Sequence, residues 1–293
     1  MSTRKESVYI TEYKQKKSNR FASAQDRRKR IGKKLGFGAS EAYKLLRTNL
    51  IFSMADESEC KIIGITSALR GEGKSTTAVN LAYMLAQGGK SVLLIEGDMR
   101  IPVLAAVLQL EEKPGLSYVL AGISSLNEAV RESSLCPGVF VLTAGELPPN
   151  PSELLSSKRM EQVLEALKPA FEYILVDLPP VNAVSDALAV SKLLSGMIVV
   201  VRQNYCDQAS LAEAMRRMEL LEVKLLGFVI NGAEAPEKRY KKYGYRYKHG
   251  KYGYEHGYAY GYGYGKKTQS AENATENRDA AVPIEYSSGT AEK

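Results

Sequence analysis

Residues 61–85 read KIIGITSALRGEGKSTTAVNLAYML: an apolar run, then a loop with two glycines, then a helical pattern. A GKST tetrad between a strand and a helix is typical of a phosphate-binding P-loop, because backbone N–H groups and the helix N-terminus cradle an anion there. The predicted nucleotide contacts are Gly71, Glu72, Gly73, Lys74, Ser75 and Thr76. Lys74 is predicted to reach the β- and γ-phosphates, and the Ser75 hydroxyl to ligate Mg²⁺. Ala68 occupies the position where this motif usually has its first glycine, and a small residue fits there.

The central part of the chain alternates short apolar runs with helical segments. Six runs rich in Val, Ile and Leu predict strands at 61–66, 91–96, 139–143, 173–177, 196–201 and 225–230. Helices are predicted at 75–87, 151–167, 185–194 and 207–221, the second with Asn150 as its N-cap. Near-continuous apolar strands are typical of a parallel sheet buried on both faces. The alternation therefore indicates a doubly wound, mostly parallel α/β sheet, which binds ligands at the carboxyl ends of its strands.

Acidic residues close two of these strands. The segment SVLLIEGDMRIP ends its strand in Glu96 and continues with Asp98, and YILVDLPP ends in Asp177. Beside a P-loop, these carboxylates are placed to act on Mg²⁺ or on an incoming hydroxyl, and Asp177 stands where a Walker B aspartate holds the metal. The predicted metal ligands are Ser75, Asp98 and Asp177. Asn231 ends the last strand, where it either hydrogen-bonds an adenine or simply forms a turn.

Charge is distributed unevenly along the 293 residues. The net charge is +7, but residues 1–34 carry +9 and residues 237–267 carry +7, which leaves −9 for the remainder. The basic flanks indicate an anionic partner such as lipid head groups, nucleic acid or an acidic protein surface, or they serve solubility alone. The chain has no run of about 18 apolar residues, a polar beginning, and three scattered cysteines, so a cytoplasmic protein without disulfides or zinc is predicted.

Three regions are predicted: a basic, disordered flank (1–37), a P-loop domain (38–235) and a flexible tail (236–293). A helix over 38–53 opens the domain, with Ser40 as its N-cap and an apolar face that includes Leu45 and Leu50. The tail holds ten tyrosines among glycines and basic residues: Tyr240, Tyr243, Tyr245, Tyr247, Tyr252, Tyr254, Tyr258, Tyr260, Tyr262 and Tyr264. No hydrophobic core can be built from such a segment.

These motifs together resemble those of the bacterial protein-tyrosine kinases, P-loop enzymes unrelated to eukaryotic kinases. The chain is most similar to the free-standing cytoplasmic form encoded for capsule and exopolysaccharide synthesis. The resemblance covers about residues 38–265 and rests on GEGKST, LLIEGDMR, ILVDLPP, LTAGELPPNPSELLSS, EAYKLLRTN and the tyrosine cluster. Each motif alone is shared with other P-loop ATPases of the MinD/ParA type, whereas their combination with the tail is specific.

The resemblance implies an ATP- and Mg²⁺-dependent tyrosine kinase. Its catalytic residues would be Lys74, Asp98, Glu96 and Asp177, with Asp98 first and Glu96 second as the group that takes the tyrosine proton. It also implies that a neighbouring subunit phosphorylates the tail tyrosines in trans. Glu41, Lys44 and Arg47 would lie on the helix that closes an oligomeric ring. A membrane-anchored protein of the polysaccharide machinery would activate the kinase and recruit it to the inner face of the membrane.

Two residues depart from the family pattern. The second motif usually has Asp where this chain has Glu96, and the longer side chain shifts the reach of the carboxylate by one methylene. The ring-forming helix usually has Arg where this chain has Lys44, which loses bidentate pairing. The second departure is expected to affect the ring more than the activity.

Two other functions fit parts of the sequence. A partitioning or septum-site ATPase of the same fold would be a switch without kinase activity. Such proteins usually carry an additional lysine near the start of the P-loop, where this chain has Arg70, and they lack a tyrosine tail. The tail could instead bind single-stranded nucleic acid, with tyrosines stacking on bases and basic residues on phosphates, or it could be a low-complexity adhesive segment.

Overall fold

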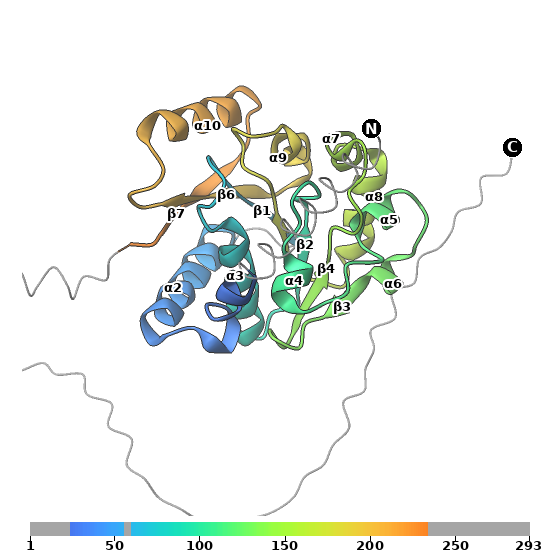
Figure 1. Ribbon diagram of the computed structural model, residues 1–293, viewed down its shortest axis with the longest axis horizontal. Helices are drawn as coiled ribbons and strands as arrows, with labels where there is room; N and C mark the ends of the chain where they lie inside the picture. Colours follow the sequence, from blue (N-terminus) through green and yellow to red (C-terminus); the bar gives the residue numbers. More distant parts are fainter. Residues whose placement is uncertain (1–23, 56–59, 234–293) are drawn as a thin grey trace, which may run out of the picture. The chain divides into compact units, whose positions relative to one another are not determined.

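A seven-stranded sheet forms the centre of the part of the chain that the computed structural model describes, residues 24–55 and 60–233 (Figure 1). The strands are β1 (Lys61–Ser67), β2 (Val92–Glu96), β3 (Val130–Glu132), β4 (Val139–Leu142), β5 (Tyr173–Asp177), β6 (Gly196–Arg202) and β7 (Leu225–Asn231). Their order is β3-β4-β2-β5-β1-β6-β7, and only the pair of β3 and β4 is antiparallel in this sheet. The predicted doubly wound, mostly parallel fold is confirmed.

Helices cover both faces of the sheet. The α-helices are α2 (Phe37–Ser53), α3 (Lys74–Gln87), α4 (Leu104–Leu108), α5 (Leu116–Leu120), α6 (Leu126–Ala129), α7 (Pro151–Leu155), α8 (Lys158–Leu167), α9 (Asp186–Ala189) and α10 (Gln208–Leu220). Two short 3-10 helices are η1 (Gly32–Lys34) and η2 (Ser191–Leu193). Figure 1 shows α2 and α3 on one side of the sheet and α9 and α10 on the other. No helix in the described ranges is both long and apolar enough to cross a membrane.

Alternate residues of the central strands feed two separate hydrophobic cores. On β2, Leu93 and Ile95 belong to the core beneath α5, α8 and α10, whereas Val92 and Leu94 belong to the core beneath α2 and α3. This alternation follows from the pleat, which sends successive side chains to opposite faces. Replacing a fully buried side chain such as Leu94 by Ala would lower the free energy of unfolding by about 2–5 kcal/mol. Large apolar residues are therefore favoured on both faces of these strands, which gives them continuous apolar sequences.

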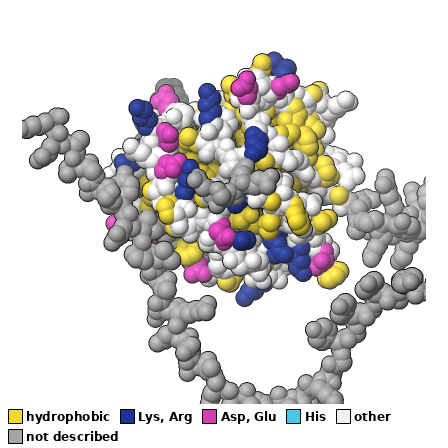
Figure 2. Space-filling view, turned by 180° about the vertical axis from the view of Figure 1, so that it is seen from behind, with side chains coloured by type: hydrophobic (Ala, Val, Ile, Leu, Met, Phe, Trp, Pro, Cys, Tyr) yellow, Lys and Arg dark blue, Asp and Glu magenta, His cyan; other side chains and the backbone are white. Residues whose placement is uncertain are grey.

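The edge strand β7 departs from the prediction that all strands are buried on both faces. Phe228 and Ile230 are about half exposed, because α10 packs Ala214 and Met218 inward and leaves the outer face of β7 uncovered. Leu226 and Val229, on the opposite face, still pack against the core beneath α2 and α3. In the rear view, hydrophobic side chains gather on the side of the molecule that carries α10 and β7 (Figure 2).

Several predicted helix boundaries were wrong. The N-cap of α2 is Gly36 rather than Ser40, whose N–H already donates to the Gly36 carbonyl inside the first turn. The expected helix over 151–167 is two helices, because the Ser157 hydroxyl accepts from the Met160 N–H and starts a new one. Leu45, expected on the buried face of α2, is exposed, whereas Leu50 is buried as expected. The short elements α4, α5, α6 and β3 were not predicted.

Residues 24–37 of the basic flank are ordered, which corrects the prediction of disorder for this part of residues 1–37. Residues 24–28 are helical, and Ala24 and Ile31 are buried in the core beneath α2 and α3. The Asn80 side chain of α3 accepts from the Gly32 N–H and donates to the Arg30 carbonyl, and these two bonds fix the segment's backbone. Residues 1–23, the tail 236–293 and all ten predicted tail tyrosines lie outside the described residues.

Candidate nucleotide-binding and phosphoryl-transfer site

The P-loop connects β1 to α3, and two of its glycines have backbone conformations that other residues rarely adopt. Gly71 has φ +92° and Gly73 has φ +99°. A Cβ atom on Gly73 would lie 2.1 Å from Nδ2 of Asn231, so a side chain there would displace the Asn231 amide. Ser75 is buried in the first turn of α3, and Thr76 is half-buried beside it. The loop therefore has the left-handed turns and the helix start that a phosphate-binding loop requires.

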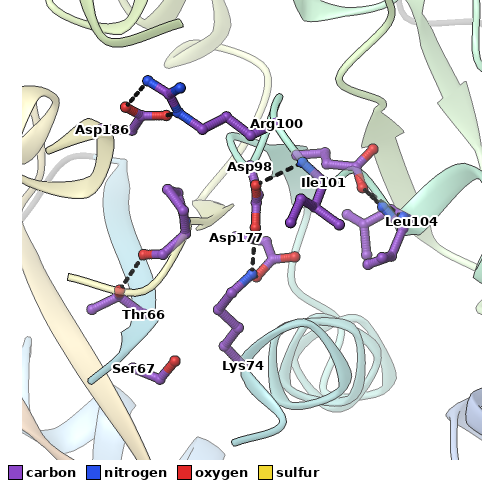
Figure 3. Close-up of polar contacts among 12 residues, drawn as sticks. Thr66, Ser67, Lys74, Asp98, Arg100, Ile101, Leu104, Asp177 and Asp186 are labelled. Carbon is purple, nitrogen blue, oxygen red and sulfur yellow. Dashed lines mark hydrogen bonds and ion pairs between the residues drawn. The ribbon is translucent and has the colours of Figure 1, made fainter. Parts of the chain in front are cut away.

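Lys74 lies between two carboxylates at the carboxyl ends of β2 and β5. Its Nζ is 3.0 Å from Asp98 Oδ2 and 3.6 Å from Asp177 Oδ1, and all three side chains are almost fully buried (Figure 3). Burial alone would lower the pKa of Lys74, but the charges of Asp177 and Asp98 outweigh it and raise that pKa above its ordinary value. The structure thus brings together three of the four predicted catalytic residues as one charged cluster.

Asp177 is the residue of this cluster whose charge is least compensated. Within the described ranges, neither carboxylate oxygen accepts a hydrogen bond of ordinary geometry, although the Ser75 hydroxyl is close enough to help lower the pKa. Burial nevertheless raises the pKa of Asp177 above its ordinary value, against the opposing charge of Lys74. A fully buried carboxylate without satisfied lone pairs is costly, and a bound cation or its water shell would satisfy it.

The donors around Asp177 suit magnesium. Carboxylate and hydroxyl oxygens are the ligands that Mg²⁺ takes from proteins, usually one or two of them together with phosphate oxygens and water. Asp98, Asp177 and Ser75 supply such oxygens at the start of α3. No group of three or more His, Cys, Asp or Glu side chains in the described residues could hold a metal by itself. A metal at this site would therefore depend on the Ser75 hydroxyl and on a nucleotide for its remaining ligands.

The loop after β2 is fixed to the end of β5. The N–H groups of Gly97 and Asp98 both donate to the Asp177 carbonyl, at 2.8 and 3.0 Å. Asp98 Oδ1 accepts from the Ile101 N–H at 3.1 Å, which leaves Oδ2 for Lys74. The Asp98 carboxylate is therefore held in place by its own loop while it faces the P-loop lysine.

Glu96 is turned away from this cluster and holds neighbouring segments together. Its Oε1 accepts from the N–H groups of Val103 and Leu104 at the start of α4, and its Oε2 accepts from the Ala144 N–H. Burial raises the pKa of Glu96 to about 7, although these three backbone hydrogen bonds oppose the shift. The additional methylene of Glu is thus used to reach α4 and the segment after β4, and both oxygens are occupied by backbone donors.

A third buried aspartate lies nearby and was missed in the sequence. Asp186, at the start of α9, is fully buried and receives a bidentate pair of bonds from Arg100, from Nε at 2.8 Å and from Nη2 at 3.0 Å (Figure 3). The Ser152 hydroxyl of α7 also donates to it. This network ties the loop after β2 to α7 and α9. Asp186 does not end a strand, so nothing in its local sequence marks it.

Glu72 and Asn231, both predicted to contact nucleotide, contact the P-loop itself. The Glu72 carboxylate is fully buried and accepts from the N–H groups of Leu69 and Arg202, at 2.6 and 3.2 Å. Asn231 Nδ2 donates to the Glu72 carbonyl at 2.7 Å. The Glu72 side chain therefore shapes the loop, which leaves only its backbone N–H for phosphate. The adenine contact of Asn231 stays a prediction.

The three residues predicted to close an oligomeric ring divide into two kinds. Glu41 and Lys44 form a half-exposed ion pair of 2.7 Å on the surface of α2. Arg47 instead donates from Nη1 to the Met84 carbonyl at 2.9 Å and packs beside Gly88, at the end of α3. Arg47 therefore stabilises the contact between α2 and α3 within one chain. Of the three, Glu41 and Lys44 are the residues whose side chains lie on the exposed surface of α2, where the predicted partner chain would contact them.

A shallow hollow at the amino-terminal ends of β1 and β5, away from the P-loop, shares no residue with this site. Its lining residues are Cys60, Lys61, Ser91, Glu165, Lys168, Pro169, Ala170, Phe171 and Glu172. The predicted catalytic residues lie instead at the carboxyl ends of the strands, where doubly wound sheets bind ligands.

Comparisons with known proteins agree with this geometry. A family model described as "AAA domain" matches residues 60–224. The chain is 40% identical over 206 residues to the tyrosine-protein kinase YwqD of Bacillus subtilis (strain 168), an alignment that covers 70% of this chain and 85% of that protein. The solved kinase domain of the Escherichia coli tyrosine kinase ETK superposes with a TM-score of 0.63 at 33% identity, covering 72% of this chain and 80% of that one.

The fold alone is also shared with a protein of the alternative class. The septum site-determining protein MinD of Pyrococcus horikoshii, solved in complex with Mg-ADP, superposes with a TM-score of 0.51 at 24% identity over 62% of this chain and 76% of that one. This likeness is limited to the arrangement of strands and helices.

Proposed function

This chain belongs to the bacterial tyrosine-protein kinases, and from that premise we propose that it transfers the γ-phosphoryl group of MgATP to tyrosines of its own C-terminal tail, in trans between copies. The observation that carries the proposal is the buried cluster of Lys74, Asp98 and Asp177 at the start of α3. A lysine and two carboxylates buried together at a P-loop serve no packing purpose, whereas phosphoryl transfer needs such charges in fixed positions.

The residues of the cluster divide the work of binding MgATP. Lys74 pairs with the β- and γ-phosphates, and the N–H groups from Gly71 to Thr76 bind phosphate oxygens. Ser75, Asp98 and Asp177 would hold Mg²⁺, which would neutralise charge that develops on the phosphates. Because Lys74 is already paired with both carboxylates, it is fixed in direction before nucleotide binds. Catalysis here is mostly positioning and electrostatic stabilisation.

Asp98 is the group that we propose to take or steer the proton of the attacking tyrosine. A tyrosine hydroxyl has a pKa of about 10, so a nearby carboxylate must assist it at neutral pH. Asp98 is slightly exposed and its Oδ2 faces the P-loop lysine. Glu96, the second candidate from the sequence, has both oxygens bonded to backbone N–H groups of other segments, whereas one oxygen of Asp98 is bonded to Lys74 of the P-loop itself. We therefore propose that Glu96 supports the reaction by positioning the loop that carries Asp98.

The tail acts as a tethered substrate and as a charge switch. Residues 237–267 carry +7 and include all ten tyrosines of the cluster. Each phosphotyrosine adds about −1.5 to −2 charges, so full modification would bring the segment to roughly −8 to −13. The chain outside the two basic flanks carries −9 and would then repel the tail. Phosphorylation is expected to loosen the oligomer, and unchanged light scattering after full phosphorylation would contradict this.

We propose two kinds of partner, both supported by the family resemblance. Copies of the chain would assemble into a ring through α2, in which Glu41 and Lys44 are outward-facing and Arg47 fixes the helix to α3. A membrane-anchored activator of the polysaccharide machinery would recruit the kinase to the inner face of the membrane. The activity would then regulate capsular or extracellular polysaccharide synthesis.

Transfer in trans can be tested by mixing two full-length variants purified with a candidate activator. The donor carries Phe at all ten tail tyrosines and an intact site, and the acceptor carries Lys74→Met and an intact tail. With MgATP, phosphotyrosine is expected on the acceptor tail, as resolved by mass spectrometry. If the wild-type chain is phosphorylated but the mixture is not, transfer occurs within one chain. If neither is phosphorylated, the kinase assignment of this chain fails.

A further inference from the structure

The P-loop is held from outside by three side chains that come from the neighbouring edge of the sheet. Tyr205 Oη donates to the Arg70 carbonyl at 2.8 Å, and Arg202 Nη1 donates to the Gly71 carbonyl at 3.3 Å. Asn231 Nδ2 donates to the Glu72 carbonyl at 2.7 Å. Three consecutive carbonyls of the loop are thus each bonded by one donor. These donors come from the end of β6, from the segment after it and from the end of β7.

A loop side chain also reaches the backbone of the sheet edge: the Glu72 carboxylate accepts a hydrogen bond from it. This side chain is fully buried and bridges the Leu69 N–H at 2.6 Å and the Arg202 N–H at 3.2 Å. Arg202 is therefore joined to the loop twice, through its backbone N–H and through its guanidinium. The result is a closed network in which β6 and the P-loop fix each other's backbone.

Holding the carbonyls determines where the N–H groups point. In a planar trans peptide the C=O and N–H bonds point in opposite directions. Bonds to the carbonyls of Arg70, Gly71 and Glu72 on the outside of the loop therefore direct the N–H groups of the following residues, up to Gly73, to the inside. Inward N–H groups are what an anion-binding loop needs, and their energetic value depends on being aligned before the phosphate arrives.

The Tyr205 ring completes this arrangement. The Arg202 guanidinium carbon lies 5.3 Å from the ring centroid, a cation–π distance, so the two side chains support each other. A Cβ atom on Gly71 would lie 3.1 Å from Tyr205 Oη, so the hydroxyl rests directly against the loop. The ring is half exposed, which rules out that Tyr205 is simply a core residue.

We propose that Arg202 and Tyr205 are positioning residues of the nucleotide site, which align the P-loop N–H groups with the phosphates of the nucleotide. This inference rests on the proposed function, because it concerns the same MgATP site. The two residues act through the backbone of Arg70 and Gly71 and touch neither the reacting phosphate nor the tyrosine. Their contribution is therefore to the phosphate part of the nucleotide, whatever base it carries.

The test compares Tyr205→Phe with Tyr118→Phe in the full-length protein. Tyr118 is a matched control, since its hydroxyl also donates a hydrogen bond, at 2.9 Å, but to the Glu146 side chain away from the P-loop. Binding of MgATP and of magnesium tripolyphosphate, which has no base, is measured by calorimetry. One hydrogen bond contributes about 0.5–1.5 kcal/mol, so Tyr205→Phe is expected to weaken the binding of both ligands roughly 2- to 10-fold. The control is expected to leave both unchanged.

Kinetics and a second variant separate alignment from general damage. For Tyr205→Phe, the KM for ATP is expected to rise in the same proportion while kcat changes less than twofold, because the bonds exist before the reaction. Arg202→Lys keeps the charge but loses the planar contact with the ring. Arg202→Lys is therefore expected to weaken the binding of magnesium tripolyphosphate as well. Its effect combined with Tyr205→Phe is expected to be less than additive, because the two side chains support one another.

Three outcomes would decide against the inference or the function beneath it. A loss confined to MgATP, with tripolyphosphate unaffected, would show that Tyr205 contacts the base and would overturn the alignment role. Equal affinities for the wild type and Tyr205→Phe with both ligands would overturn it as well. A wild-type chain that binds neither ligand would instead overturn the proposed MgATP site, and with it the inference.

Discussion

Asp177 and Asp186 are both fully buried and both lie near the carboxyl ends of the strands, yet their surroundings differ. Asp186 accepts two bonds from Arg100 and one from Ser152, so its charge is matched by a guanidinium in good geometry. Asp177 accepts no hydrogen bond of ordinary geometry in the described residues, and its nearest cation, Lys74, is 3.6 Å away. One aspartate is satisfied by the protein alone and the other is not.

On this difference we assign Asp186 to the stability of the fold and propose Asp177 for the reaction. A satisfied buried ion pair fixes the segments that it joins, here the loop after β2 with α7 and α9. An unsatisfied buried carboxylate costs stability, and chains retain such groups where a ligand uses them. Replacing Asp177 by Asn is therefore expected to lower activity but not stability, whereas replacing Asp186 by Asn is expected to lower mainly stability.

The largest expected effect is that of Asp177→Asn on activity. Removing the negative charge removes a predicted Mg²⁺ ligand, so phosphotyrosine formation is expected to fall by about 100-fold or more. Thermal stability is expected to stay equal or to rise, because an uncompensated buried charge is removed while Lys74 keeps Asp98. Kinase assays and thermal denaturation of the same preparation measure both. A large loss of stability would place Asp177 with Asp186 as a structural residue.

Glu96→Gln tests a third buried carboxylate, which is hydrogen-bonded but whose pKa is still strongly raised. Burial raises the pKa of Glu96 from 4.5 to about 7, so the folded state binds more protons than the unfolded state between these values. The contribution of Glu96 to stability is therefore fully present below about pH 4.5 and is lost as the pH rises through 7. The total change is up to about 3 kcal/mol.

The readout for Glu96→Gln is the slope of stability against pH, measured by denaturant unfolding from pH 4.5 to 8. Gln does not titrate, so the difference between wild type and variant is expected to change with pH across this range. The absolute stability of the variant is less informative, since Gln cannot accept all three backbone bonds. A difference that is constant with pH would contradict the raised pKa of Glu96.

Asp186→Asn is expected to have a smaller effect, and mainly on stability. Breaking a buried pair leaves Arg100 without its partner, but the Arg100 side chain is 41% exposed and water can solvate it. The expected cost is about 1–3 kcal/mol, seen as a Tm lower by several degrees. Specific activity below the transition is expected to change far less than in Asp177→Asn. An activity loss as large as that of Asp177→Asn, without a change in Tm, would remove the contrast.

Much of the site could be predicted from the sequence, because its residues follow strands of strong apolar character. The P-loop glycines, Lys74, Asp98 and Asp177 each stand at a fixed offset from such a strand, and parallel strands bring these offsets to one edge. The pairing of β2 with β5 places Glu96 beside Asp177 in register, but it does not say which way each side chain turns. The hydrogen bonds from the start of α4 to the Glu96 carboxylate therefore could not be predicted from the sequence.

The residues that were missed act through contacts distant in sequence. Arg202 and Tyr205 bond to a loop about 130 positions away, and Asp186 pairs with a residue 86 positions away. No local pattern encodes such a contact. The ordered part of the basic flank was missed for a similar reason, since its few apolar residues show no period. They are buried because α3 provides Asn80 and an apolar surface for them.

The central claim is that the Lys74 cluster transfers phosphate to the tail of this chain. Its most direct measurement is site-resolved mass spectrometry of the full-length protein after incubation with MgATP and a candidate activator. Lys74→Met is compared with Lys90→Met, which removes a surface lysine paired with Glu172. The account predicts phosphotyrosine within residues 240–264 of the wild type and of Lys90→Met, and none in Lys74→Met. Phosphotyrosine that persists in Lys74→Met would contradict the account.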